Sequence, residues 1–124
     1  MTKIDRELMR GAGPVAVLKL LSAGEMYGYE LVQALSQRSE GVLGMQQSTL
    51  YPLLYNLEAK GLIAAQWRET ESKRKRKYYT LTSAGTDRLA ADEKQWRSLV
   101  AAMTSIGILD PLNPQNPLSG GAKA

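Results

Sequence analysis

The chain has 124 residues, the size of a single domain, and 44% of them are hydrophobic, which is enough for one modest core. It contains no cysteine and no histidine, which excludes disulfides, thiol nucleophiles, imidazole general bases and the usual zinc sites. A formal net charge of +4 favours an anionic partner. No apolar run is long enough to span a membrane, and the charged N-terminal residues lack the apolar segment of a secretory signal. These features predict a cytoplasmic protein without a metal or a cofactor.

Residues 1–24 have the pattern of a largely buried helix. Asp5 is a candidate N-cap, and the apolar side chains of residues 15–21 surround the axis almost completely. Pro14 can restart a helix, because proline is tolerated in a first turn. The sequence is therefore compatible with one kinked helix or with two helices, and Gly24 is expected to end the region.

Residues 25–28 are predicted to form a short turn, residues 29–39 a second helix, and the segment from Ser48 to Gly61 a third helix. Ser48 is the expected N-cap of the third helix and Gly61 its expected C′ residue. With that start, Pro52 falls near the end of the first turn and costs little, whereas a start at Gln46 makes Pro52 remove an internal hydrogen bond. The apolar face is marked by leucines at i, i+3, i+4 and i+7, which are Leu50, Leu53, Leu54 and Leu57.

The hydrophobic pattern changes after the third helix from a helical period to strict alternation. Residues 63–68 predict a half-buried strand in which Trp67 packs, and residues 77–82 predict a second strand rich in β formers. A lone hairpin is marginally stable, so this two-stranded ribbon must lean on the helices. Three helices followed by a ribbon predict a winged helix-turn-helix, a mainly α fold with a small β-hairpin.

Five consecutive cations are predicted to lie at the tip of this ribbon, and they are Lys73, Arg74, Lys75, Arg76 and Lys77. A charge run is usually a solvated face. Cations packed this closely also repel one another, and DNA phosphates relieve that repulsion while releasing counterions. Because the run lies beside a candidate recognition helix, we expect these side chains to hold phosphates.

The start of the third helix is crowded with polar groups that can reach base edges or phosphates when a helix end enters the major groove. The residues expected to recognise base edges, or to orient the helix on them, are Gln46, Gln47, Ser48, Thr49 and Tyr51. Tyr55 is expected to bind a phosphate.

A last helix is expected to be capped by Thr82 or Ser83 and to run to about Ile106. Its apolar side chains have coiled-coil-like spacing, interrupted at Asp92, which predicts a partner helix from a second subunit. The alternative is that this stripe packs on its own domain. The predicted interface residues are Leu89, Trp96, Leu99, Val100, Met103 and Ile106. Residues 107–124, with prolines three residues apart, are expected to form a tail with little regular structure.

Taken together, these segments resemble the PadR family of bacterial transcriptional regulators. The resembling residues are Met26 to Leu31, Ser48 to Ile63, the basic run Lys73 to Lys77, and Tyr78 to Thr82 with Gly85. The resemblance implies a homodimer that represses its genes and releases a double-stranded DNA operator when a small molecule binds. It also implies that residues 1–82 form the winged helix-turn-helix DNA-binding domain, residues 83–106 the dimerisation helix, and residues 107–124 a tail.

The resemblance further implies a ligand site. In short, multidrug-sensing relatives, a tryptophan at the point that matches Trp96 faces its twin across the dimer and stacks planar aromatic ligands. Leu8 and Val15 match pocket-lining positions of those relatives. A cavity of this kind would select a small, planar, apolar effector. Trp96 can equally serve as an interface anchor, since tryptophan is a common hot-spot residue.

Two other functions have to be weighed against a DNA-binding regulator. A winged helix can also be a protein-docking module without specific DNA binding, which the five-cation run argues against. An enzyme is disfavoured, because the chain lacks histidine, cysteine, a glycine-rich phosphate loop and a convincing pair of carboxylates. Glu58, the nearest candidate acid, is expected to pair with a surface cation of the ribbon or of the second helix.

Overall fold

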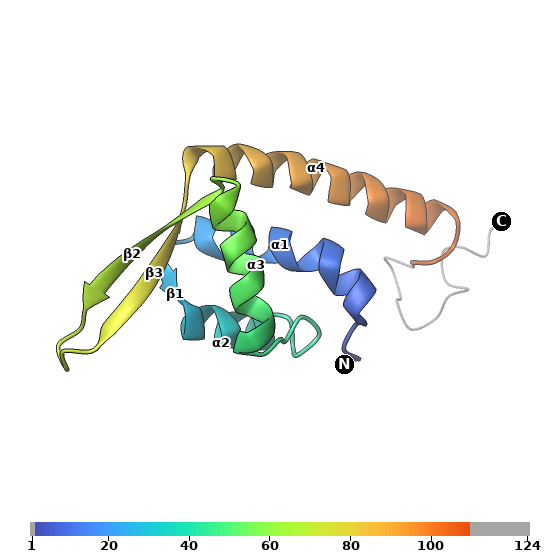
Figure 1. Cartoon of the computed structure of the whole chain (residues 1–124). Coiled ribbons are helices and arrows are strands. Elements are labelled where there is room, and N and C mark those ends of the chain that lie inside the picture. The colour runs from blue at the N-terminus through green and yellow to red at the C-terminus, as the bar shows by residue number, and fades with distance from the viewer. Residues whose placement is uncertain (1, 110–124) are drawn as a thin grey trace. The chain divides into compact units, whose positions relative to one another are not determined.

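Figure 1 shows a computed structural model of the chain, in which residues 2–109 are described. These residues form α1 (Arg6–Ser22), β1 (Met26–Tyr27), α2 (Gly28–Arg38), α3 (Gln47–Ala59), β2 (Ile63–Glu69), β3 (Lys75–Leu81) and α4 (Ser83–Ser105). The chain divides into two compact units, of which the first ends at Leu89 and the second begins at Ala90. The mainly helical fold with a winged hairpin is as predicted. Within residues 2–109, no helix is long and apolar enough to cross a membrane.

The first region is one continuous helix rather than two. The Asp5 carboxylate accepts a hydrogen bond from the Leu8 N–H at 3.0 Å, so the predicted N-cap is confirmed. Pro14 lies inside α1 without breaking it. The helix ends at Ser22, and Gly24 follows with a φ of 153°, a conformation that glycine adopts without a steric penalty.

The third helix begins earlier than predicted. Gln46, and not Ser48, is the N-cap of α3, and its carbonyl accepts hydrogen bonds at 3.0 Å from both the Thr49 and the Leu50 N–H groups. This start places Pro52 in the helix interior, where its missing N–H removes the helical partner of the Ser48 carbonyl. Ser48 is exposed, so water can satisfy that carbonyl, and the early start is therefore tolerated.

The end of α3 is the one that the sequence predicts. Gly61 has a φ of 75°, and its N–H donates to the Glu58 carbonyl at 2.9 Å. The next N–H, that of Leu62, donates to the Leu57 carbonyl at 3.0 Å. This pair of bonds is a Schellman motif, which satisfies the last carbonyls of a helix and needs a residue that tolerates positive φ.

The sheet has three strands in the order β1-β3-β2, all antiparallel, so the expected two-stranded ribbon carries an additional strand. The segment predicted as a turn supplies it, because Met26 pairs with Tyr79 and Tyr27 with Tyr78. Two residues are too few to show an alternating pattern in a sequence. The added strand covers one edge of β3 and joins the ribbon to the start of α2.

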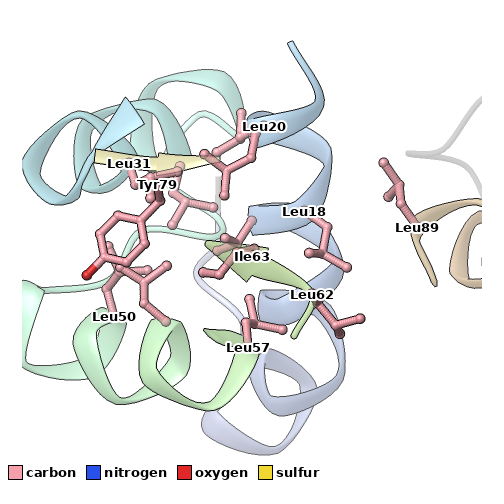
Figure 2. Packing of buried hydrophobic residues seen from close by; sticks show 13 residues of the cluster. Leu18, Leu20, Leu31, Leu50, Leu57, Leu62, Ile63, Tyr79 and Leu89 are labelled. Carbon is pink, nitrogen blue, oxygen red and sulfur yellow. The ribbon is translucent and has the colours of Figure 1, made fainter. Parts of the chain in front are cut away.

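The core of the first unit lies where three helices meet one face of the sheet (Figure 2). Leu18, Leu31 and Leu50 come from three different helices, and each is at most 1% exposed. Ile63 and Tyr79 enter the same cluster from β2 and β3. Burial of one such leucine contributes about 1.5–3 kcal/mol, so this cluster dominates the stability of the unit.

The start of α4 belongs to this core. The Thr82 hydroxyl accepts from the Gly85 N–H at 3.0 Å and donates to the Gly61 carbonyl at 2.7 Å, so Thr82 is the predicted cap of a helix beginning at Ser83. Gly85 packs so closely on the Leu62 carbonyl that a Cβ atom has no room there. These contacts bury Leu89 to 6% exposure within its own chain, although the sequence predicts it at a subunit interface.

The part of α4 in the second unit keeps large apolar side chains exposed. Trp96 is 39% exposed, Leu99 and Val100 are each 46% exposed, and Ile106 beyond the helix end is 74% exposed. Met103 is half-buried. Of the predicted tail, residues 110–124 lie outside the described residues.

Candidate nucleic-acid interface

The N-terminus of α3 is an open, polar helix end. Gln46, Gln47, Ser48 and Thr49 are all exposed, and no side chain caps the helix there. The first turn contains no acidic residue. The positive end of the helix dipole and its uncapped N–H groups are therefore available to an anion, and four polar side chains surround them.

Two tyrosines, one turn apart on α3, extend this surface. Tyr51 is 46% exposed and Tyr55 is 72% exposed. The Tyr51 ring lies directly on Gly28, the first residue of α2, where an added Cβ atom would stand 2.7 Å from the ring. The missing side chain of Gly28 thus provides the space in which the phenol of Tyr51 is held.

The hairpin of β2 and β3, which we call the wing, has a tight turn at its tip. The Thr70 N–H donates to the Arg74 carbonyl at 2.8 Å, and the Lys73 N–H donates to the Thr70 carbonyl at 2.9 Å. Lys73 has a φ of 62°, which is uncommon for a residue other than glycine. Only Lys73 and Arg74 lie in this turn, because β3 begins at Lys75, two residues before the predicted strand.

The five wing cations are not equivalent. Arg76 stacks on the Tyr27 ring, with 4.3 Å between the guanidinium carbon and the ring centroid. Lys77 forms an ion pair with Glu58 at 3.5 Å, which confirms the expected surface partner of that acid. Within residues 2–109, by contrast, Lys73, Arg74 and Lys75 have no ion-pair partner. Three cations at the wing tip are therefore free to bind an external anion.

One face of the wing carries a stack that sequence reasoning missed, which we call the arginine-tyrosine stack. Its members contact one another in the order Glu25, Arg68, Tyr78, Tyr27 and Arg76. The Arg68 guanidinium forms two hydrogen bonds with the Glu25 carboxylate and lies 4.6 Å from the Tyr78 ring centroid. Tyr78 then meets Tyr27 edge to face at 5.5 Å between centroids.

The stack solves an electrostatic problem of the hairpin. Arg68 and Arg76 are direct cross-strand partners, and like charges in that position repel each other. Each guanidinium instead lies on a tyrosine ring, and Glu25 neutralises one of them. The hydrogen bond from Arg68 lowers the pKa of Glu25, and the positive charge of the guanidinium lowers it further. The same hydrogen bond raises the pKa of Arg68. The wing is thereby tied to the residues that precede α2.

The wing, α3 and the start of α2 line a groove of about 660 Å³, which we call the wing groove and which Tyr27 and Arg76 of the stack also border. Tyr51 and Tyr55 line it from α3, and Trp67 and Lys75 line it from the wing. Tyr79 also lines it and is 7% exposed, and its pKa is raised by burial and lowered less strongly by the nearby Lys77. Trp67 is 63% exposed, so the expectation that it packs is wrong. Within residues 2–109, the indole is therefore largely open to solvent.

The residues implied for ligand binding are distributed over both units. Leu8 on α1 is 62% exposed, and Val15 on the same helix packs partly buried against the core. Trp96 lies on the part of α4 that belongs to the second unit.

Comparison with known proteins identifies relatives that match most of the chain. The model of the transcriptional regulator PadR-like family matches residues 17–91. The transcriptional regulator Rv3488 of Mycobacterium tuberculosis is 34% identical over 94 residues, which are 76% of this chain and 84% of the relative. A PadR family transcriptional regulator from Eggerthella lenta has a similar crystal structure, with a TM-score of 0.71, 37% identity and coverage of 81% of this chain and 85% of the other.

A further similar structure contains nucleic acid. Bacillus subtilis PadR, determined in complex with operator DNA, matches with a TM-score of 0.60 and 29% identity. The match covers 64% of this chain and 45% of the Bacillus chain, so the two share a part of their length.

Proposed function

Because this chain belongs to the PadR-like family of transcriptional regulators, we propose that it is a homodimeric repressor that holds operator DNA with α3 and the wing. Membership of the family makes the chain a transcriptional regulator and not an enzyme. The observation that carries the proposal is the combination of an uncapped, polar helix N-terminus with three wing cations that have no ion-pair partner within residues 2–109. The helix N-terminus supplies hydrogen-bonding groups for base edges, and the wing cations supply positive charge for phosphates.

In this proposal the DNA contacts are divided by chemistry. The side chains that enter the major groove are Gln46, Gln47, Ser48 and Thr49. Tyr51, held on Gly28, contacts a base edge or its sugar. Tyr55 and the free wing cations bind phosphates. Arg76 and Lys77 already have partners within the chain and contribute less to DNA affinity. Bacillus subtilis PadR in complex with operator DNA supports this use of the fold.

The exposed apolar side chains of α4 support a homodimer. Trp96, Leu99, Val100 and Ile106 would be covered by the same helix of a second subunit. Leu89 is buried in its own core, so the interface that we propose starts after the first turns of α4. A two-fold dimer would place its recognition helices about 34 Å apart, which sets half-sites about 10 base pairs apart.

Regulation by a small molecule is part of the proposal. A planar apolar effector would stack on Trp96 at the dimer interface. Such a ligand acts only if it binds the DNA-incompetent arrangement more tightly than the competent one. A coupling of about 1–3 kcal/mol is typical and weakens operator binding by up to about a hundredfold.

The test is binding of the chain to its own upstream DNA, titrated against salt, with and without a planar aromatic dye. Specific binding with a steep negative salt slope, weakened by the dye, supports operator recognition, the phosphate contacts and release by a planar ligand. Specific binding that ignores the dye retains the operator-binding role and removes the effector site. Binding that does not distinguish the upstream DNA from random DNA counts against a local operator and favours a protein-docking role for the winged helix.

A further inference from the structure

The wing groove combines exposed aromatic rings with cations, and duplex DNA explains the cations and the tyrosine hydroxyls but not the exposed faces of the rings. Trp67, Tyr55 and Tyr51 are 63%, 72% and 46% exposed and all line the groove. Lys75, on the same wall as Trp67, has no ion-pair partner within residues 2–109. In a duplex the faces of the bases are stacked against each other, so a protein ring cannot stack on them. Exposed ring faces beside cations are instead the feature that binds unpaired nucleotides.

We propose that the wing groove also binds single-stranded nucleic acid, whose bases stack on Trp67 and Tyr55 while its phosphates contact Lys75 and Arg74. This inference rests on the proposed function, because the same face would hold the duplex operator. It adds a second ligand with different chemistry at that face. The groove volume of about 660 Å³ lies within the range of ordinary ligand sites and exceeds the needs of one planar ring.

The register of the hairpin places the two kinds of group side by side. Trp67 on β2 is the direct cross-strand partner of Lys77 on β3, and Lys75 follows two residues away on the same face of β3. Glu58, the acid that lines the groove, is already paired with Lys77. A strand lying along this face would therefore meet alternating aromatic and cationic groups, with its phosphates facing net positive charge.

Binding of a single strand has a direct consequence for regulation. A strand in the wing groove would occupy Tyr55 and the free wing cations, which the duplex also requires. Single strand and operator should therefore compete, and an unpaired strand would release the operator without any contact to Trp96.

The first experiment detects the strand at Trp67. The chain has two tryptophans, so the emission of Trp67 is obtained as the difference between the wild-type chain and a Trp67→Phe variant. The probe is an oligothymidylate of about 12 nucleotides, which cannot pair with itself and matches the usual site sizes of such grooves. Quenching of the Trp67 emission on titration is expected. Binding that leaves this emission unchanged would place the strand elsewhere and overturn the proposal.

The second experiment separates stacking from charge. Trp67→Leu should weaken oligothymidylate binding by about fivefold or more, because it removes one stacking ring, while duplex binding changes by no more than about twofold. Lys75→Gln should weaken both ligands. Lys94→Gln is the matched charge control, since Lys94 is exposed and does not line the groove. An equal loss on both ligands for Trp67→Leu would make Trp67 a duplex contact and contradict the proposal.

Two further arms assign the source of the ligand and separate this inference from the proposed function. Thymidine monophosphate should bind far more weakly than the oligomer. Equal affinity would mean that the ligand of the groove is a free nucleotide and not a strand. If the operator binds and the oligothymidylate does not, this inference fails alone. If the oligothymidylate binds at Trp67 while no duplex is recognised specifically, the repressor proposal fails and the groove remains a single-strand site.

Discussion

The unequal state of the wing cations leads to a quantitative prediction. Replacing Lys73, Arg74 and Lys75 together with glutamine removes the three wing cations that have no partner within residues 2–109. Each phosphate contact contributes about 0.9 to the slope of log affinity against log salt concentration. If each of the three holds one phosphate, the slope should flatten by up to about 2.7 per subunit and about 5.4 per dimer.

That change in slope is large enough to measure directly. Between about 50 and 200 mM salt, the ratio of wild-type to variant affinity should fall by about a thousandfold for a dimer with both wings on DNA. The assay is fluorescence anisotropy of a labelled operator duplex and of a random duplex of equal length, each at several salt concentrations. Because phosphates carry no sequence information, both duplexes should lose the same slope.

The contrast with the partnered cations refutes or supports the reasoning. The double variant Arg76→Gln, Lys77→Gln should flatten the slope by much less. Arg76 already stacks on Tyr27, and Lys77 already pairs with Glu58. A variant with three exposed cations replaced elsewhere, Lys3, Arg10 and Lys94, controls for total charge. A larger loss on operator than on random DNA would show that the wing reads sequence. An equal flattening by the partnered pair would show that intramolecular contacts do not set the phosphate role.

Three other variants test the fold, the arginine-tyrosine stack and the effector site. Gly85→Ala should lower the free energy of unfolding by about 1–3 kcal/mol in urea titrations, because its Cβ would overlap the Leu62 carbonyl. Gly11→Ala is the matched control, since its Cβ meets nothing within 4 Å and alanine favours a helix. Glu25→Gln should be less stable than wild type above pH 4.5, and the difference should vanish as the pH falls through the lowered pKa of the carboxyl; a difference that persists at acid pH contradicts the ion-pair account. Trp96→Ala should abolish binding of a planar dye while operator binding stays detectable, and undiminished dye binding would place the effector site elsewhere.

Much of the fold could be predicted because local chemistry determines it. The Asp5 cap, the positive φ at Gly61 and the Thr82 cap each follow from one residue type at a helix end. The start of α3 could not be fixed in the same way. Ser48 is a good cap by type, but the Gln46 carbonyl already closes a turn two residues earlier, and the interior proline is tolerated because Ser48 is exposed.

The features that the sequence concealed depend on pairing between distant segments. A two-residue strand has no periodicity of its own, and it forms here because β3 offers an edge to Met26 and Tyr27. The stack of Arg68 on Tyr78 likewise needs the hairpin register, although opposing arginines on paired strands are a signal that could have prompted a search for partners. Trp67 was misjudged because alternation identifies a face but not whether anything covers it.

These concealed contacts explain how one hairpin can have both a rigid and an open face. On one face, the arginine-tyrosine stack uses Arg68 and Arg76 to tie the wing to the residues before α2, which fixes its direction relative to α3. On the other face, Trp67 and Lys75 remain uncovered in the wing groove. Had the three cations of β3 alternated the other way, two arginines would lie on the face of Trp67 and one lysine would lie on Tyr27. Guanidinium groups stack on aromatic rings better than ammonium groups do, so the arginines lie where stacking is needed. Along β3, Arg76 thus stacks on Tyr27 and also borders the wing groove, while Lys75 and Lys77 lie on the face of Trp67, where the proposed nucleic-acid contacts are.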